Sequence, residues 1–191
     1  MSRWFLEVSY KGTAYSGFQS QHNTGKTIQA EIEKAFAVLQ REEVVMTGSS
    51  RTDAGVHALQ NYFHFDYEGK IHPQFLYKVN AILPDDIVIR KLIPVWGEKH
   101  CRFDALSRKY RYYIYRSKDP FMQDRAFYFP YRLEIEKMQE AATVLKGYTD
   151  FTSFSKRNTQ VKTFECRIIE SWWEVEEENL VYHVRANRFI T

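Results

Sequence analysis

One carboxylate in this sequence has small, turn-forming neighbours rather than other acids. Asp53 lies in the Gly-Ser-Ser-Arg-Thr-Asp-Ala-Gly-Val-His-Ala run at residues 48–58, two positions after the positive charge of Arg51. The flanking residues, 43–47 and 59–67, are typical of strands, so we expect Asp53 on a loop between two strands. Such a loop can present a nucleophile or a general base. A surface turn held by an Asx hydrogen bond explains the same residues.

A basic, tyrosine-rich stretch is the second group of residues with chemical potential. Residues 100–118 hold six basic residues against one acidic residue, although the net charge of the chain is only +3. Tyrosines at 110, 112, 113 and 115 alternate with these charges. Cations suit a phosphate backbone and aromatic rings suit unstacked bases, so RNA is a natural ligand. A half-buried strand with snorkelling cations is the alternative.

Composition restricts the class of protein. The chain has 191 residues, with 44% hydrophobic and 27% charged residues, as in soluble globular proteins of one large or two small domains. No apolar stretch approaches the roughly 18–20 residues of a membrane span, and no signal peptide is recognisable. Cys101 and Cys166 form no metal-binding pattern and fit a reducing cytoplasm as small buried hydrophobes. We therefore expect no membrane association, metal or cofactor.

The first half of the chain predicts a split βαβ unit. Residues 3–10 alternate as a half-buried strand, and Thr27 caps a predicted helix that runs to about residue 41. Two strands surround the Asp53 loop, and the second is predicted to place Leu59, Phe63, Phe65 and Tyr67 on one face. A short helix after Pro73 and a strand over 86–95 complete the order β-α-β-β-α-β.

The second half restarts the same pattern. We predict a strand over 109–117, a helix over 133–146 with Gly147 at its C-cap, and strands over 161–175 and 180–186. A full repeat needs a closing helix and strand of roughly 30 further residues, so the second unit is expected to be incomplete. The fold class is α+β, with subdomains at 1–105 and 106–191. Together they predict one wide, mostly antiparallel sheet with helices on one face and a central basic cleft.

Five segments, in order along the chain, resemble the tRNA pseudouridine synthase A family. They are residues 10–21, 27–33, 51–58, 103–112 and 150–154. The resemblance implies the pseudouridine synthase fold and isomerisation of uridine to pseudouridine in the anticodon stem-loop of tRNA, without a cofactor. It also implies cytoplasmic localisation and a homodimer that binds tRNA.

The resemblance assigns roles to three residues, and the basic stretch adds candidate phosphate contacts. It makes Asp53 the essential nucleophile or base, and attack on the ribose, attack on the base and removal of the 2′ proton all stay open. It associates Arg51 with extrusion of the target nucleotide, while pairing with Asp53 or a phosphate clamp are alternatives. It implies that Tyr110 packs on the uracil and that its hydroxyl could help to remove the C5 proton. Stacking is favoured of these two roles, because a phenol of pKa about 10 is a poor base, and a core aromatic is the alternative. The candidate phosphate contacts are Arg102, Arg108 and Arg111.

The resemblance stops at the end of the chain. Family members continue past the strand that matches residues 181–189 into a helix with another arginine near the catalytic acid, and this chain ends at residue 191. We therefore expect the C-terminal segment to be missing, and dimerisation to depend on it.

Two other functions are consistent with parts of the sequence. A catalytically inactive RNA-binding module or RNA chaperone would use the same basic, aromatic stretch. It has no need of Asp53, however, because a carboxylate repels phosphate. An aspartic hydrolase reading of Thr52, Asp53, Ala54 and Gly55 is weak, because that chemistry needs a second, proton-sharing carboxylate.

Overall fold

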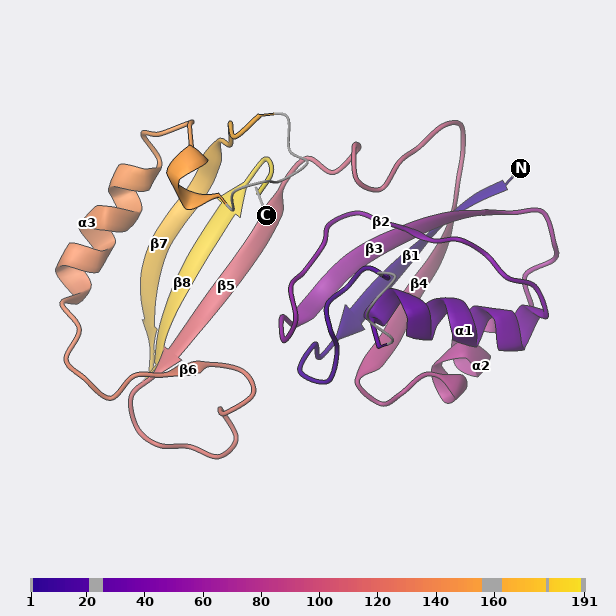
Figure 1. Ribbon diagram of the computed structural model, residues 1–191, viewed down its shortest axis with the longest axis horizontal. Helices are drawn as coiled ribbons and strands as arrows, with labels where there is room; N and C mark the ends of the chain where they lie inside the picture. Colours follow the sequence, from indigo (N-terminus) through magenta and orange to yellow (C-terminus); the bar gives the residue numbers. More distant parts are fainter. Residues whose placement is uncertain (1, 21–25, 156–162, 178, 190–191) are drawn as a thin grey trace. The chain divides into compact units, whose positions relative to one another are not determined.

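The structure, a computed structural model, describes residues 2–20, 26–155, 163–177 and 179–189 (Figure 1). The chain divides into two compact units, Met1–Ala105 and Leu106–Thr191. Each unit combines strands and helices, which confirms the predicted α+β class. Strand pairing gives two sheets of four strands, where the sequence predicted one wide sheet. Within the described ranges, the structure contains no helix long and apolar enough to cross a membrane.

The first unit is the split βαβ fold that the sequence predicts. Its strands pair antiparallel in the order β2-β3-β1-β4. The elements along the chain are β1 (Ser2–Tyr10), α1 (Ile28–Gln40), β2 (Thr47–Gly48), β3 (Ala58–Tyr67), α2 (Phe75–Ile82) and β4 (Ile87–Val95).

Helix α1 supplies much of the core of this unit. The Thr27 hydroxyl accepts a hydrogen bond from the Ala30 amide at 3.2 Å, which confirms the predicted N-cap. Side chains of α1 and α2 pack with the inward residues of β1 and β3 in one cluster. Its fully buried members include Leu6, Val8, Phe18, Ile28, Ile32, Phe36, Phe63 and Val79.

The strand predicted over residues 43–47 is much shorter than expected, because helix α1 binds the backbone of this segment. The Met46 amide donates to Glu33 Oε1 at 2.8 Å, and the Met46 carbonyl accepts from Gln29 Nε2 at 2.9 Å. Since both backbone groups of Met46 are satisfied by side chains, they do not join the sheet. Only Thr47 and Gly48 pair with β3.

The predicted inner face of β3 is correct except at Leu59. Phe63, Phe65 and Tyr67 are buried, whereas Leu59 is 86% exposed. The register between β1 and β3 shifts between Val8 and Tyr10, where β3 has one extra residue. Such a bulge reverses the alternation of side chains, so Leu59 leaves the face that it would occupy in a regular strand.

The second unit repeats part of the first. Strands β5, β8 and β7 pair antiparallel as β1, β3 and β2 do, and the two-residue β6 adds to β5 in parallel. The elements are β5 (Arg108–Tyr115), β6 (Phe127–Tyr128), α3 (Ile135–Leu145), the 3-10 turn η1 (Thr152–Phe154), β7 (Ile168–Glu176) and β8 (Asn179–Ala186). The predicted β-α-β-β order is therefore present, with β6 as an addition. Of the strand predicted over 161–175, residues 161 and 162 lie outside the described ranges, and the observed strand begins only at Ile168.

Helix α3 covers its sheet less completely than the sequence predicts. Of the expected inward side chains, only Ala142 is buried, while Ile135, Met138 and Leu145 keep contact with solvent. The C-cap is Lys146 rather than Gly147. Cys101 and Cys166 are free thiols and both are buried, as expected of small hydrophobes.

Candidate active site

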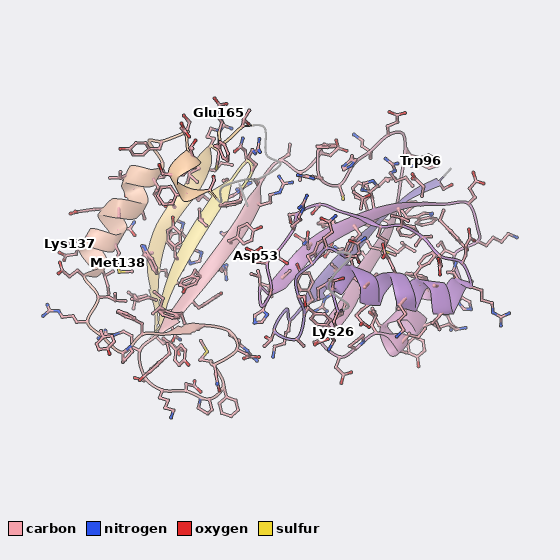
Figure 2. All side chains as sticks on the ribbon, viewed as in Figure 1. Lys26, Asp53, Trp96, Lys137, Met138 and Glu165 are labelled. Atoms are coloured by element: carbon pink, nitrogen blue, oxygen red, sulfur yellow. The ribbon has the colours of Figure 1, made fainter. Side chains whose placement is uncertain are left out.

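Asp53 lies on the loop that joins β2 to β3, in the first unit. Figure 2 shows its side chain on this loop, and both Asp53 and Arg51 are exposed. The Val56 amide donates to the Asp53 carbonyl at 3.3 Å and tightens the turn around the acid. The Asp53 carboxylate is thus accessible to a ligand while its backbone is held.

A second loop, residues 11–20, supports the Asp53 loop from the side. The Gly55 amide donates to the Gly12 carbonyl at 3.2 Å, and the Phe18 amide donates to the Thr52 carbonyl at 3.1 Å. The Gly12 amide in turn donates to Nδ1 of His57 at 2.9 Å. The His57 side chain therefore joins the two loops through its Nδ1 atom.

Glycine is required where the two loops touch. A Cβ atom on Gly12 would lie 2.1 Å from the Val56 carbonyl oxygen. Gly17 has φ of +114° and lies against Thr52, where a Cβ would be 3.0 Å from the carbonyl oxygen. Sequence reasoning found the glycine-rich loop but not its partner, because contacts between distant loops leave no periodic signal.

Among the described residues, the ion pairs do not include one between Arg51 and Asp53. Its guanidinium is exposed on the same loop, two residues before the acid. The role of Arg51 therefore rests on the family motif and on its nearness in sequence, not on a contact with the carboxylate.

Arg102 belongs to a turn that is anchored to the sheet of the first unit. Next to it, the Cys101 thiol lies 3.1 Å from Nδ1 of His64 and donates to the Thr47 carbonyl at 3.3 Å. Burial, with smaller contributions from the charges of His100 and Arg3, lowers the pKa of His64 to about 4. The Arg102 side chain is exposed, so a fixed backbone presents a cation to solvent.

Tyr110 and Arg108 occupy the beginning of β5, in the second unit. The Tyr110 ring packs edge-on against Phe189, with ring centroids 4.8 Å apart, and is partly exposed. Arg108 donates from Nη1 to the Asn187 carbonyl at 3.1 Å. Both side chains are thus steadied by the segment that follows β8.

The basic character of β5 is partly balanced by acids on β7. Lys109 and Arg185 both pair with Glu170, at 3.5 and 3.2 Å. A hydrogen bond to Tyr113, together with the nearby carboxylates of Glu176 and Glu174, raises the pKa of Arg111. The sequence predicted a basic strand but not these partners, which come from a strand some 60 residues later.

One cluster among the described residues has the ligand types of a metal site. Ligand atoms of Glu174, Glu176 and His183 lie within 4.8 Å of one another. His183 Nε2 is 2.9 Å from Glu174 Oε2, its ring stacks on Trp172, and Arg111 is its cross-strand neighbour. Because the charge of Arg111 already offsets these carboxylates, the cluster is best described as an ion-pair group.

Comparisons with known proteins identify the family to which this chain belongs. Residues 7–104 match the sequence model of a family described as tRNA pseudouridine synthase. The chain is 45% identical over 192 residues to the tRNA pseudouridine synthase A of Parabacteroides distasonis, covering 100% of this chain and 76% of that protein. It is 41% identical to the enzyme of the same name from Porphyromonas gingivalis, over 100% of this chain and 77% of that protein. The corresponding protein of Staphylococcus saprophyticus is 41% identical over 98% of this chain and 71% of its own length.

The α+β fold, the supported aspartate loop and these matches define a pseudouridine synthase, an isomerase that acts on uridine in RNA. Within that class, the chain belongs to the tRNA pseudouridine synthase family.

Proposed function

We propose that this chain converts uridine to pseudouridine in the anticodon stem-loop of tRNA, with the Asp53 carboxylate as the nucleophile. The proposal rests on the exposed acid of a loop that lies inside the segment matching the family. Residues 11–20 bind the backbone of this loop both before and after Asp53, at Thr52 and at Gly55. An acid that only ended a turn would not need a second loop to hold it.

The reaction needs one carboxylate, and the product has the same atoms as the substrate uridine. The N1–C1′ bond of uridine breaks, a C5–C1′ bond forms, the C5 proton is lost and N1 gains a proton. Charge that develops on the sugar during bond cleavage is stabilised by a nearby anion. As the nucleophile, the Asp53 carboxylate forms a covalent bond to the substrate, and this bond breaks again before the product is released, which restores the free carboxylate. The proton that leaves C5 passes to solvent.

Arg51 and Tyr110 complete the handling of the target base. A uridine in a stem-loop must leave its stack before it can react, which costs unstacking energy. Arg51 occupies the space that the nucleotide leaves, and the Tyr110 ring stacks on the extruded uracil. The partial exposure of Tyr110 and its support by Phe189 are consistent with a stacking surface.

Three arginines bind the tRNA backbone in this proposal. Arg102, Arg108 and Arg111 contact phosphates, which fixes the register of the RNA without reading its sequence. The resemblance further implies that the enzyme acts in the cytoplasm as a homodimer on tRNA. The acids beside Arg111 limit its contribution, so we expect Arg108 to matter more than Arg111.

The proposal is tested with tRNA that carries tritium at C5 of uracil. Incubation with the chain should release tritium, and mapping of the product should place pseudouridine in the anticodon stem-loop. Asp53→Asn should release none while still binding tRNA. Binding without release by the unaltered chain would favour the RNA-binding alternative, and pseudouridine elsewhere in the tRNA would contradict the proposed target.

A further inference from the structure

We propose that Asn61 is a positioning residue for Asp53, acting through a buried hydrogen-bond chain beneath the catalytic loop. This inference rests on the proposed function of Asp53. Asn61 lies on β3 and is only 5% exposed, so it touches neither solvent nor a bound tRNA. Its amide is nevertheless bound to the loop on one side and to Tyr10 on the other.

The Asn61 amide is fully used, which fixes its orientation. Its Oδ1 accepts from the Ser49 hydroxyl at 2.8 Å, the Ser50 hydroxyl at 3.2 Å and the Tyr62 amide at 2.9 Å. Its Nδ2 donates to the Tyr10 hydroxyl and to the Ser50 carbonyl, both at 3.3 Å. A backbone amide can only donate, so the contact with Tyr62 decides which end of the side chain is the oxygen.

The chain of hydrogen bonds continues to the residue before Asp53. The Tyr10 oxygen accepts from Asn61 and also lies 2.9 Å from Thr52 Oγ1, so the two hydroxyl groups share a hydrogen bond in which either can be the donor. The Thr52 carbonyl is separately held by the Phe18 amide at 3.1 Å. Side chain and backbone of Thr52 are thus both restrained, and Asp53 is attached to it directly.

These hydrogen bonds connect the Asp53 loop to the buried core of the first unit. Tyr10 is buried at the end of β1, and its ring contacts Phe18, which stacks on Phe63 at 4.3 Å. An apolar side chain in place of Asn61 could fill the same volume, but it could not fix the direction of the loop. Displacement of a reacting group by about 1 Å is enough to slow a reaction roughly 100-fold.

The test compares Asn61→Leu with a matched variant, Asn80→Leu. Asn80 also lies in the first unit and also uses both ends of its amide, in hydrogen bonds to the amide and carbonyl of Ile89 at 2.8 and 2.9 Å. These bonds join α2 to β4 rather than to the Asp53 loop. Both variants lose the hydrogen bonds of an asparagine amide, but only Asn61→Leu loses the connection to Asp53.

We expect Asn61→Leu to lower the single-turnover rate of tritium release from C5 about 100-fold, with tRNA affinity changed by less than about threefold. Asn80→Leu should keep the rate within about twofold under conditions where both variants are folded by circular dichroism. Equal loss of rate in the two variants would overturn the inference, as would a fall in affinity that matches the fall in rate.

Smaller changes keep the test decisive if Asn61→Leu does not fold. Tyr10→Phe removes the hydroxyl group that lies between Asn61 and Thr52. Thr52→Val removes the Thr52 hydroxyl group and keeps the shape of the side chain. Each should lower the rate about tenfold, and the double variant should lose no more than the larger single loss, because both break one chain. Additive losses, or no loss in either variant, would overturn the inference.

Asp53→Asn, measured in parallel, separates the two proposals. If Asp53→Asn retains the wild-type rate, the proposed function fails and the positioning role fails with it. If Asp53→Asn abolishes the rate while Asn61→Leu and Tyr10→Phe do not lower it, only the positioning role is wrong.

Discussion

Helices α1 and α3 follow the first strands of two units with related strand orders, yet they pack differently. α1 buries Ile28, Ile32, Ala35 and Phe36 against its sheet. α3, all of whose residues are described, buries only Ala142. The first unit therefore has an extensive core beneath its loops, and the second presents more of its apolar and aromatic side chains to solvent.

This difference matches the different demands of chemistry and binding. In our proposal Asp53 must meet a reacting atom within a fraction of an ångström, and its loop rests on the better-packed unit. Tyr110 and Arg108 stack on a base and pair with phosphate in our proposal, and both interactions tolerate small displacements. The comparison predicts that small displacements of side chains lower activity strongly in the first unit and only weakly in the second.

The largest expected contrast is in stability. Ile32→Ala, in α1, should lower the free energy of unfolding by about 2–5 kcal/mol, because Ile32 is 0% exposed and leaves a cavity. Ile135→Ala, in α3, should cost less than about 1 kcal/mol, because that side chain is 36% exposed. Urea unfolding of both variants measures the difference, and equal costs would break the comparison.

Loop geometry gives the next largest effect. Gly12→Ala should slow tritium release about 100-fold, because its new methyl group would overlap the Val56 carbonyl and push the two loops apart. Gly147→Ala in the second unit is the control, since its Cβ would meet the nearest atom at 3.4 Å. A Gly12→Ala enzyme with unaltered activity would show that the loops need not touch for catalysis.

The stacking role of Tyr110 predicts a smaller loss. Tyr110→Ala should weaken binding of the reacting tRNA by about 1–3 kcal/mol, the typical value for one base stacked on an aromatic ring. Tyr110→Phe keeps the ring and should lose little, as measured by kcat/KM for tritium release. Complete inactivity of Tyr110→Phe would instead assign a chemical role to the hydroxyl group.

The last prediction concerns pH and the buried His64. Its pKa is lowered from 6.5 to about 4 in the folded chain, so the unfolded chain binds more protons between these values. This contribution to stability is present above pH 6.5 and is lost as the pH falls towards 4, at no more than about 1.4 kcal/mol per pH unit. Urea unfolding at several pH values should show that the free energy of unfolding depends less on pH in His64→Gln than in the unaltered chain. An equal dependence on pH in the two proteins would contradict this account.

Local patterns in the sequence predicted much of the fold. The Thr27 cap and the spacing of Ile28, Ile32 and Phe36 specify α1, and both are confirmed. The predictions are wrong where contacts with residues far away in the sequence change the local structure. Gln29 and Glu33 remove Met46 from the sheet, and a bulge turns Leu59 outward.

The candidate site shows the same limit. The residues around Asp53 indicate an acid on a turn, and it is the resemblance to the family that makes this acid the catalytic candidate. The contacts of Gly12 with His57 and of Asn61 with Tyr10 join segments 45 and 51 residues apart. No periodicity encodes such pairs, so the structure is needed to find the residues that hold the acid.

The central claim is that Asp53 performs the chemistry and contributes little to tRNA binding. The most direct test is the single-turnover rate of tritium release, with saturating enzyme, for the unaltered chain and for Asp53→Asn, together with the Kd of each for the same tRNA. We predict a rate lower by at least about 1,000-fold and a Kd within about threefold. A rate within tenfold of the unaltered chain, after deamidation is excluded by mass spectrometry, would contradict the account.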